Sequence, residues 1–386
     1  MKKNVFLLFL LLVLSCFYSC REEETYIDSE ETENVALPVP NTSVQGFFLL
    51  NEGNMGMNRA TIDYFDYETG TYHRNIYPSR NPSEVKELGD VGNDLQIYGD
   101  RLFAIINVSN YLEVMDLKGK HIKSIDIPNC RYIIFNGDKA YVSSYATPVS
   151  IDPNAGKGLV FEIDLNTLEI LRKVEVGYQP EQMLVKNNKL YVANSGGYRV
   201  PNYDHTISVV DLDQFVELKK IDVAINLHRM LADNYGKIYV TSRGDYYDIP
   251  ASLYVIDSAT DEVIQKIDTP ITQMCLVDDQ MYFYGVNFSY NTGKNEVNYG
   301  ILDTKTRKIV ANKIITDGTE KQIMMPYGLF VNPETREIFI TDAQDYVVSG
   351  LVYCFSADGK FQWKVLAGNI PAHIAFVNKN LNKSFN

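Results

Sequence analysis

The sequence lacks most of the motifs on which catalytic sites are commonly built. It contains no H-E-x-x-H, G-x-S-x-G or P-loop motif, and its five histidines are scattered without metal-ligand spacing. It has a single tryptophan, Trp363, whereas a quinone-dependent dehydrogenase would be expected to use several. We therefore expect that the protein is not an enzyme and that it holds no catalytic cofactor and no metal ion.

Cysteine and positive charge are also scarce. Beyond residue 20 the only cysteines are Cys130, Cys275 and Cys354, each within an apolar strand pattern and without C-x-x-C spacing. That setting is typical of small buried side chains. Lys and Arg number 36 against 49 Asp and Glu, so the formal net charge is −13. This acidity argues against nucleic acid or an anionic membrane face as a partner.

The N-terminus is predicted to be a lipoprotein signal followed by a tether. Lys2 and Lys3 precede an apolar run at residues 5–14 that is too short to span a bilayer and is typical of a secretory signal. Residues 1–19 resemble a bacterial lipoprotein signal, with Cys20 or Cys16 as the acylated residue. Cys20 is favoured because the acidic stretch after it resembles the tag of surface lipoproteins of the Bacteroides type. A cleaved signal that releases a periplasmic protein is the alternative. Residues 20–45 are charged and then punctuated by proline, which predicts a flexible tether.

The rest of the chain is a repeat. An aromatic residue stands within a short apolar strand pattern seven times, about 48 residues apart on average. These residues are Phe48, Phe103, Tyr141, Tyr191, Tyr239, Tyr282 and Phe339. A blade of four antiparallel strands occupies about 40–50 residues. We therefore predict an all-β, seven-bladed β-propeller over residues 46–380. The strand at residues 374–377 should complete the first blade and close the ring, which removes an exposed sheet edge.

In each blade a second strand follows the aromatic one, and six of the seven end in Asp. These residues are Asp66, Asp116, Asp164, Asp211, Asp257 and Asp303. An Asp at this position can accept hydrogen bonds from the following backbone N–H groups and tighten the turn. We predict that these carboxylates stabilise turns and are not catalytic.

Loop lengths distinguish the two faces of the ring. With strands A to D counted outwards from the axis, the AB and CD turns are short, whereas the BC loops are long. The long BC loops are residues 51–59, 143–157, 194–204, 242–251, 285–297 and 342–349. Because strands alternate in direction, the BC loops and the junctions between strand D and the next strand A (DA junctions) share one face. We call it the long-loop face and predict that it carries the function, since long loops in compact folds are usually functional.

The candidate ligand-binding residues belong to two groups on this face. The BC loops carry aromatic side chains suited to a large, flat ligand, namely Tyr145, Tyr198, Tyr203, Tyr246, Tyr247, Phe288, Tyr290 and Tyr346. The first BC loop and the DA junctions carry mostly polar residues expected around the channel mouth, namely Asn51, Glu52, Asn54, Asn93, Asp94, Arg131, Gln182, His228, Arg229, Gln273, Tyr327 and His373. Three alternatives stay open: aromatics that pack on neighbouring loops, a solvated polar funnel, and a structural turn at Gly53 in which Asn51 and Asn54 bond the backbone.

Several segments resemble known propellers. Residues 189–196 (KLYVANSG) and 206–211 (TISVVD) resemble YncE-like propellers, which indicates the fold and little about function. Residues 50–56 (LNEGNMG), 88–92 (LGDVG) and 97–103 (IYGDRLF) resemble the Bacteroidetes lipoprotein propellers that include the BtuG-type cobalamin-binding proteins. The similarity covers the whole chain, signal and tether included.

This resemblance implies a surface-exposed outer-membrane lipoprotein that binds cobalamin (vitamin B12 or another corrinoid) on the long-loop face. It would pass the ligand to a BtuB-like TonB-dependent transporter and be monomeric apart from that partner. The alternative is a surface scaffold that binds a glycan or another protein through the same Tyr-rich loops. A calcium-dependent hydrolase would need several carboxylates at the channel, where the polar ring supplies only Asp94.

Overall fold

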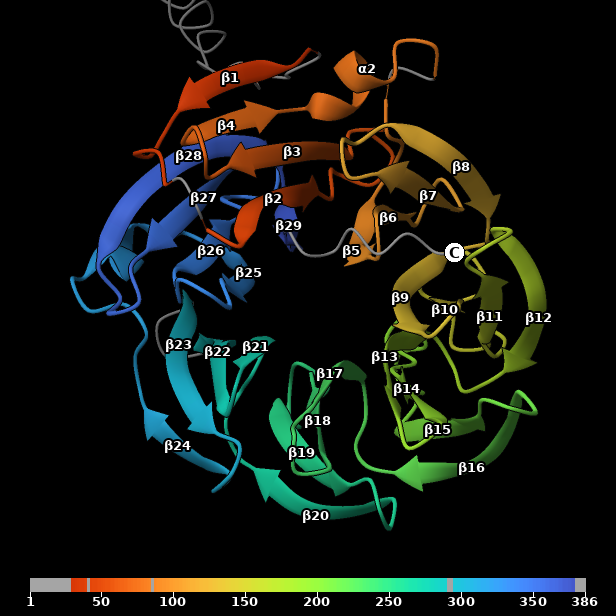
Figure 1. The fold of residues 1–386 in the computed structure, drawn as a ribbon. Helices are drawn as coiled ribbons and strands as arrows, with labels where there is room; N and C mark the ends of the chain where they lie inside the picture. Colours follow the sequence, from red (N-terminus) through yellow and green to blue (C-terminus); the bar gives the residue numbers. More distant parts are fainter. Residues whose placement is uncertain (1–28, 40–41, 85–86, 290–293, 379–386) are drawn as a thin grey trace, which may run out of the picture.

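Seven antiparallel sheets form a closed ring in the computed structural model of the chain (Figure 1), which describes residues 29–39, 42–84, 87–289 and 294–378. Cys16, Cys20 and the expected signal peptide lie outside these residues. The inner strands contact one another in the order β29, β5, β9, β13, β17, β21 and β25, and β25 contacts β29 again. The predicted seven-bladed propeller is confirmed.

Six blades have four strands each in sequence order. Blade two contains β5 (Gly92–Tyr98), β6 (Arg101–Ile106), β7 (Tyr111–Asp116) and β8 (His121–Asp126). Blade three contains β9 (Cys130–Asn136), β10 (Lys139–Ser144), β11 (Leu159–Asp164) and β12 (Glu169–Glu175). Blade four contains β13 (Pro180–Lys186), β14 (Lys189–Asn194), β15 (Thr206–Asp211) and β16 (Val216–Asp222).

The remaining three of these blades repeat the pattern. Blade five contains β17 (Leu227–Ala232), β18 (Lys237–Ser242), β19 (Ser252–Asp257) and β20 (Glu262–Ile267). Blade six contains β21 (Gln273–Val277), β22 (Gln280–Ser289), β23 (Lys294–Asp303) and β24 (Lys308–Ala311). Blade seven contains β25 (Pro326–Val331), β26 (Ile338–Asp342), β27 (Ser349–Phe355) and β28 (Phe361–Asn369). The helices α2 (Ile76–Arg80) and η1 (Thr319–Gln322) are short, and no helix of the described residues is long and apolar enough to cross a membrane.

Blade one closes the ring with strands from both ends of the described chain. Its order is β1 (Glu31–Asn34), β4 (Thr71–Arg74), β3 (Thr61–Asp66), β2 (Val44–Asn51) and β29 (Pro371–Asn378). β29 pairs with β2, with Phe376 opposite Phe47 and Ile374 opposite Leu49. The predicted closure by the C-terminal strand is therefore confirmed.

Within the expected tether at residues 20–45, residues 31–34 form the strand β1 and are not flexible. This strand pairs with β4, and Arg74 forms ion pairs with Glu31 and Glu33 at 2.9 and 3.1 Å. The segment is charged because both its faces meet solvent, so composition alone resembles a disordered linker. The open edge of β4 supplies the hydrogen-bonding partners that order it.

The predicted loop at residues 285–297 is wrong, since β22 and β23 continue as a paired hairpin to Ser289 and Lys294. Tyr284, Val286 and Phe288 alternate with other residues at the period of a strand, which the surrounding asparagines obscure. The six Asp-terminated strands behave as predicted. For example, Asp116 accepts hydrogen bonds from the backbone N–H groups of Lys118 and Lys120 at 2.8 and 2.9 Å.

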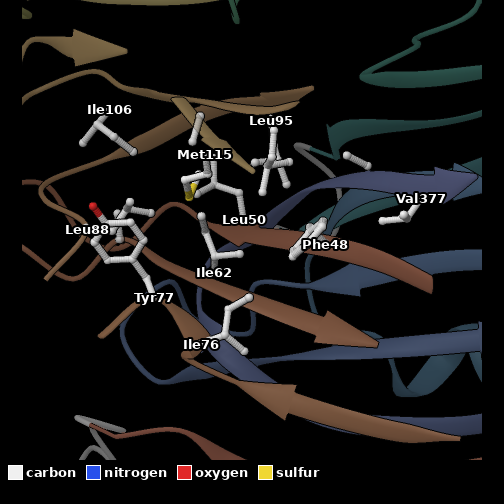
Figure 2. Close-up of a cluster of buried hydrophobic side chains, with 14 residues drawn as sticks. Phe48, Leu50, Ile62, Ile76, Tyr77, Leu88, Leu95, Ile106, Met115 and Val377 are labelled. Carbon is white, nitrogen blue, oxygen red and sulfur yellow. The ribbon is translucent and has the colours of Figure 1, made fainter. Parts of the chain in front are cut away.

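The core is divided into apolar clusters that lie between adjacent blades. Figure 2 shows the cluster between blades one and two, where Phe48 and Leu50 of β2 face Leu95 of β5 and Ile106 of β6. Equivalent clusters fill the other six interfaces. Each blade thus buries both faces only when the ring is complete.

We predict that Phe47→Ala destabilises the closure by about 3–5 kcal/mol, because Phe47 is fully buried at the seam. Its ring centroid lies 5.0 Å from that of Phe339 and 6.0 Å from that of Phe376. Urea unfolding followed by circular dichroism measures the loss. Phe361→Ala on the outer strand β28 is the matched control and should cost much less. Equal losses for the two variants would contradict the role of the seam.

Candidate functional site

A cavity of about 620 Å³ opens on the long-loop face between blades five, six and seven. BC-loop residues such as Tyr246 and Tyr346 line it together with DA-junction residues such as Thr272 and Met325, so the two predicted sets of connections do converge. Volumes of about 300–1,000 Å³ are usual for small-molecule sites. Six predicted site residues line the cavity: His228, Arg229, Tyr246, Tyr247, Tyr327 and Tyr346.

Bulges at the start of the inner strands aim several of these side chains. In four blades two inner-strand residues oppose a single residue of the next strand. The bulged pairs are Arg131 and Tyr132, Glu181 and Gln182, His228 and Arg229, and Tyr327 and Gly328. A bulge of this type breaks the strict alternation of a strand and redirects side chains.

A hydroxyl group supports three of the four bulges. Ser143, Thr241 and Thr341 are the single residues that oppose the bulged pairs in blades three, five and seven. Their side-chain oxygens accept the backbone N–H groups of Tyr132, Arg229 and Gly328 at 3.1, 3.0 and 2.7 Å. A recurrent Ser or Thr near the end of strand B is therefore the sequence signal that could have located the bulges.

Tyrosines form one wall of the cavity. The Tyr327 and Tyr346 rings meet edge to face with centroids 6.0 Å apart. The Tyr327 hydroxyl donates to Glu52 Oε2 at 2.7 Å, and the Tyr284 hydroxyl donates to the Tyr327 carbonyl oxygen at 2.6 Å. These bonds fix the orientation of the tyrosine side chains before a ligand binds, which lowers the entropic cost of binding. At the rim, Tyr246 is 64% exposed.

A buried charge network lies beside the cavity. Glu181 is 1% exposed and contacts Arg131 and Arg243 at 3.2 and 3.5 Å, and it accepts the Tyr145 hydroxyl at 2.6 Å. Burial by itself would raise the pKa of Glu181, but the two arginines and this hydrogen bond hold it below the usual value. Glu181 and Arg243 are absent from the predicted site. In blade four the sequence pattern assigns the ring position to Gln182, and Glu181 precedes it by one residue.

Two predicted histidines occupy the same region. His228 Nε2 lies 3.0 Å from the Tyr132 hydroxyl. Burial first, and then the positive charges of Arg243, Arg229 and Arg131, lower the pKa of His228 well below its ordinary value. His228 is therefore neutral at physiological pH. His373 Nε2 lies 3.7 Å from Glu52 Oε1.

Several predicted polar residues tie adjacent blades together. Asn93 donates to the Arg131 carbonyl oxygen at 2.5 Å, Asp94 accepts the Ile133 N–H at 3.0 Å, and Gln182 accepts the Met230 N–H at 2.8 Å. Each bond joins one blade to the next. Gln273 accepts the N–H of its neighbour Met274 at 3.3 Å. These side chains therefore form hydrogen bonds with the backbone of the propeller itself.

The first BC loop matches the alternative of a structural turn for Asn54, which bonds backbone, whereas Asn51 bonds a side chain. Gly53 has φ +73°, and a Cβ there would lie 2.5 Å from the Arg59 carbonyl carbon. Asn51 is buried and donates to Thr61 Oγ1 at 3.0 Å, while Asn54 bonds the Tyr346 carbonyl oxygen. Asn54 thereby joins the loops of blades one and seven.

The remaining predicted aromatics differ in exposure. Tyr145 is fully buried, with the Arg131 guanidinium 4.7 Å from its ring centroid. Tyr198 is partly exposed and its ring contacts Tyr145. Phe288 belongs to β22, but its side chain lies outside the described part of the structure, as does Tyr290. Among the described residues no group of His, Cys, Asp or Glu could hold a metal ion.

The cysteines behave as small buried side chains. Cys130 and Cys354 are buried and Cys275 is partly so. Burial raises the pKa of the Cys130 thiol to about 12 and that of Cys275 to about 11. At neutral pH both are protonated thiols with little reactivity.

Together these features define a class: a seven-bladed propeller with a preformed cavity on its long-loop face. Residues 45–366 match the family described as Domain of unknown function (DUF5074). The chain therefore belongs to this family, to which no enzymatic activity is assigned. No curated protein matches the sequence.

Solved structures show the same fold in proteins of different kinds. A quinoprotein alcohol dehydrogenase-like protein from Bacteroides thetaiotaomicron is 15% identical, with a TM-score of 0.58 over 87% of this chain and 79% of that one. A hypothetical selenium-binding protein from Sulfolobus tokodaii is 14% identical, with a TM-score of 0.59 over 86% and 93%. The hydrazine synthase of Kuenenia stuttgartiensis is 13% identical, with a TM-score of 0.59 over 74% and 89%. At these identities the likeness concerns the fold alone.

We predict that Glu181→Gln lowers the free energy of unfolding by about 3–5 kcal/mol at pH 7, because two arginines lose their buried counter-charge. The pKa of Glu181 is lower in the folded than in the unfolded chain, so its contribution is present at neutral pH and is lost as pH falls through that folded value. The difference in free energy of unfolding between wild type and variant should therefore become smaller in acid. Urea titrations at pH 7 and pH 4 measure both effects. Glu175→Gln, which removes the exposed partner of Lys157, should cost under about 1 kcal/mol.

We predict that His228→Gln makes stability less sensitive to mild acid. The pKa of His228 is far lower in the folded chain, so only the unfolded chain takes up this proton as pH falls below about 6.5. This uptake weakens folding by up to about 1.4 kcal/mol per pH unit. Urea midpoints between pH 7 and 5 should fall less steeply in the variant. Identical slopes would contradict the proposed environment of His228.

Proposed function

We propose that this protein is a surface-exposed outer-membrane lipoprotein that binds a corrinoid such as cobalamin on its long-loop face and passes it to a BtuB-like TonB-dependent transporter. The observation that carries the proposal is the cavity between blades five, six and seven. It combines an aromatic wall with arginine and amide groups. A corrinoid likewise combines a broad apolar ring with peripheral amides and a phosphate.

The cavity would accept part of such a ligand. A whole corrinoid is larger than 620 Å³, so the rest would lie across the open rim. Tyr246 and Tyr247 are 64% and 78% exposed there and offer rigid aromatic area. The asparagines Asn287 and Asn295 of the β22–β23 hairpin face the opening from blade six and could bond amides. This arrangement favours capture of a large ligand over enclosure of a small one.

Binding without turnover is favoured by the state of the carboxylates. Glu181 is neutralised by Arg131 and Arg243, and Glu52 accepts the Tyr327 hydroxyl. Asp94 accepts backbone N–H groups from Leu95 and Ile133. A general base must lie within hydrogen-bond reach of the substrate, and these carboxylates are held by groups of the scaffold. We accordingly propose that the protein is not an enzyme and uses no catalytic cofactor or metal.

The proposed anchorage is compatible with an open cavity. β1 leads into the propeller at the outer edge of blade one, whereas the cavity lies between blades five and seven. A lipid on Cys20, or on Cys16, would thus hold the protein from the outer edge of a blade that does not line the cavity. The proposal includes a monomer that contacts the transporter and makes no contact with nucleic acid.

A glycan is the second candidate ligand, since exposed tyrosines such as Tyr198, Tyr246 and Tyr247 also suit stacking against sugar rings. Retention on an immobilised polysaccharide without uptake of coloured corrinoid would favour the glycan. If the protein binds neither the polysaccharide nor the corrinoid, a protein ligand is favoured.

We predict tight 1:1 binding of cyanocobalamin by the chain that lacks its lipidated cysteine, measured by isothermal titration. Tyr346→Ala should weaken the affinity about 10- to 100-fold, because it removes an aromatic side of the cavity wall. Tyr235→Ala is the matched control, since this exposed tyrosine lies in an AB turn on the other face. Absence of binding at micromolar concentrations would refute the corrinoid proposal.

A further inference from the structure

Arg229 is a cation in the cavity that has no anionic partner among the described residues. Two arginines line the cavity, and Arg243 is matched by Glu181 at 3.5 Å. Arg229 makes no side-chain hydrogen bond or ion pair with any described residue, and its Nε is buried without a partner. A buried polar group that lacks a protein partner costs free energy unless a water, ion or ligand bonds it.

The backbone holds this side chain in place. Arg229 belongs to the bulge of β17, where its N–H donates to Thr241 Oγ1 at 3.0 Å. Its guanidinium carbon lies 5.3 Å from the centroid of the Tyr132 ring. The contact with an aromatic face orients the guanidinium and leaves the planar fork of N–H donors available.

Arginines outnumber carboxylates among the described residues that line the cavity, although the protein is acidic. The formal net charge of the chain is −13, yet among the described residues that line the cavity Asp248, on the exposed rim, is the single carboxylate. Arg131 and Arg243 share one carboxylate, Glu181, and Glu52 accepts the hydroxyl of the wall residue Tyr327. The same positive charges contribute to the lowered pKa of His228. An anion that enters the cavity would thus move from the surroundings of an acidic protein to a site beside two arginines.

We propose that Arg229 binds an anionic group of the ligand, a phosphate or carboxylate, through paired N–H donors at the floor of the cavity. The guanidinium is suited to such bidentate contacts. The anion site requires only the cavity. Its assignment to the phosphodiester of a corrinoid rests on the proposed function. Free inorganic phosphates have the same chemistry, and the experiment separates the two sources.

The first measurement uses inorganic pyrophosphate as probe and does not depend on the proposed function. Millimolar pyrophosphate should raise the melting temperature of the wild type above that in sodium chloride of equal ionic strength. Arg229→Gln should lose this rise and Arg229→Lys should keep part of it. Arg172→Gln is the matched control. Arg172 also lies against an aromatic ring, Phe215 at 4.9 Å, but pairs with Glu162 on the outer side of blade three. Circular dichroism verifies that each variant is folded.

The second measurement compares cobalamin with cobinamide, a corrinoid that lacks the phosphate and nucleotide. Arg229→Gln should bind cobalamin about 10- to 100-fold more weakly than wild type and cobinamide equally well. Loss of the pyrophosphate effect without any corrinoid binding would support the anion site and refute the proposed function. Corrinoid binding with no effect of Arg229 in either measurement would refute the anion site and leave the proposed function intact. Absence of both corrinoid binding and any Arg229-dependent effect would refute both.

Discussion

The pairing of β2 with β29 is the constraint on which the rest of the structure depends. Each blade is apolar on both faces and needs a neighbouring blade on each side. All seven blades have two neighbours only when the ring is closed. The seam joins the two ends of the described chain through Phe47 and Phe376. Closure also fixes the axis around which the inner strands gather, and therefore the position of every DA junction.

The site follows from this geometry through a local irregularity repeated in several blades. Regular strands would direct alternate side chains to opposite faces. The two-residue bulges at the start of β9, β13, β17 and β25 instead present polar or aromatic residues, with Gly328 as the exception. Hydrogen bonds between blades, such as that from Met230 to Gln182, hold the bulged segments in register. Part of the polar ring thus forms hydrogen bonds between blades, whereas Arg229 lines the cavity.

The functional conclusions depend on the site more than on the fold. Propellers of the same shape occur in proteins as different as a hydrazine synthase and a hypothetical selenium-binding protein, and the family of this chain has no assigned function. This propeller has a cavity lined by tyrosines and two arginines in an acidic protein. That combination favours a large ligand with both apolar and anionic parts.

The sequence by itself determined the blade number, the turn-stabilising aspartates, the C-terminal closing strand and the face that carries the long connections, because these features depend on local periodicity and on chain direction. It also placed His228, Arg229, Tyr246, Tyr247, Tyr327 and Tyr346 among the site residues. Only the tertiary structure decided which of the predicted residues face the cavity and which bond the neighbouring blade. Asn51 and Tyr145 are buried, while Glu181 and Arg243, which sequence reasoning left out, form the central ion pair. The physical reason is that a bulge shifts side-chain direction by one residue, and ion pairing between blades joins positions about 60 residues apart.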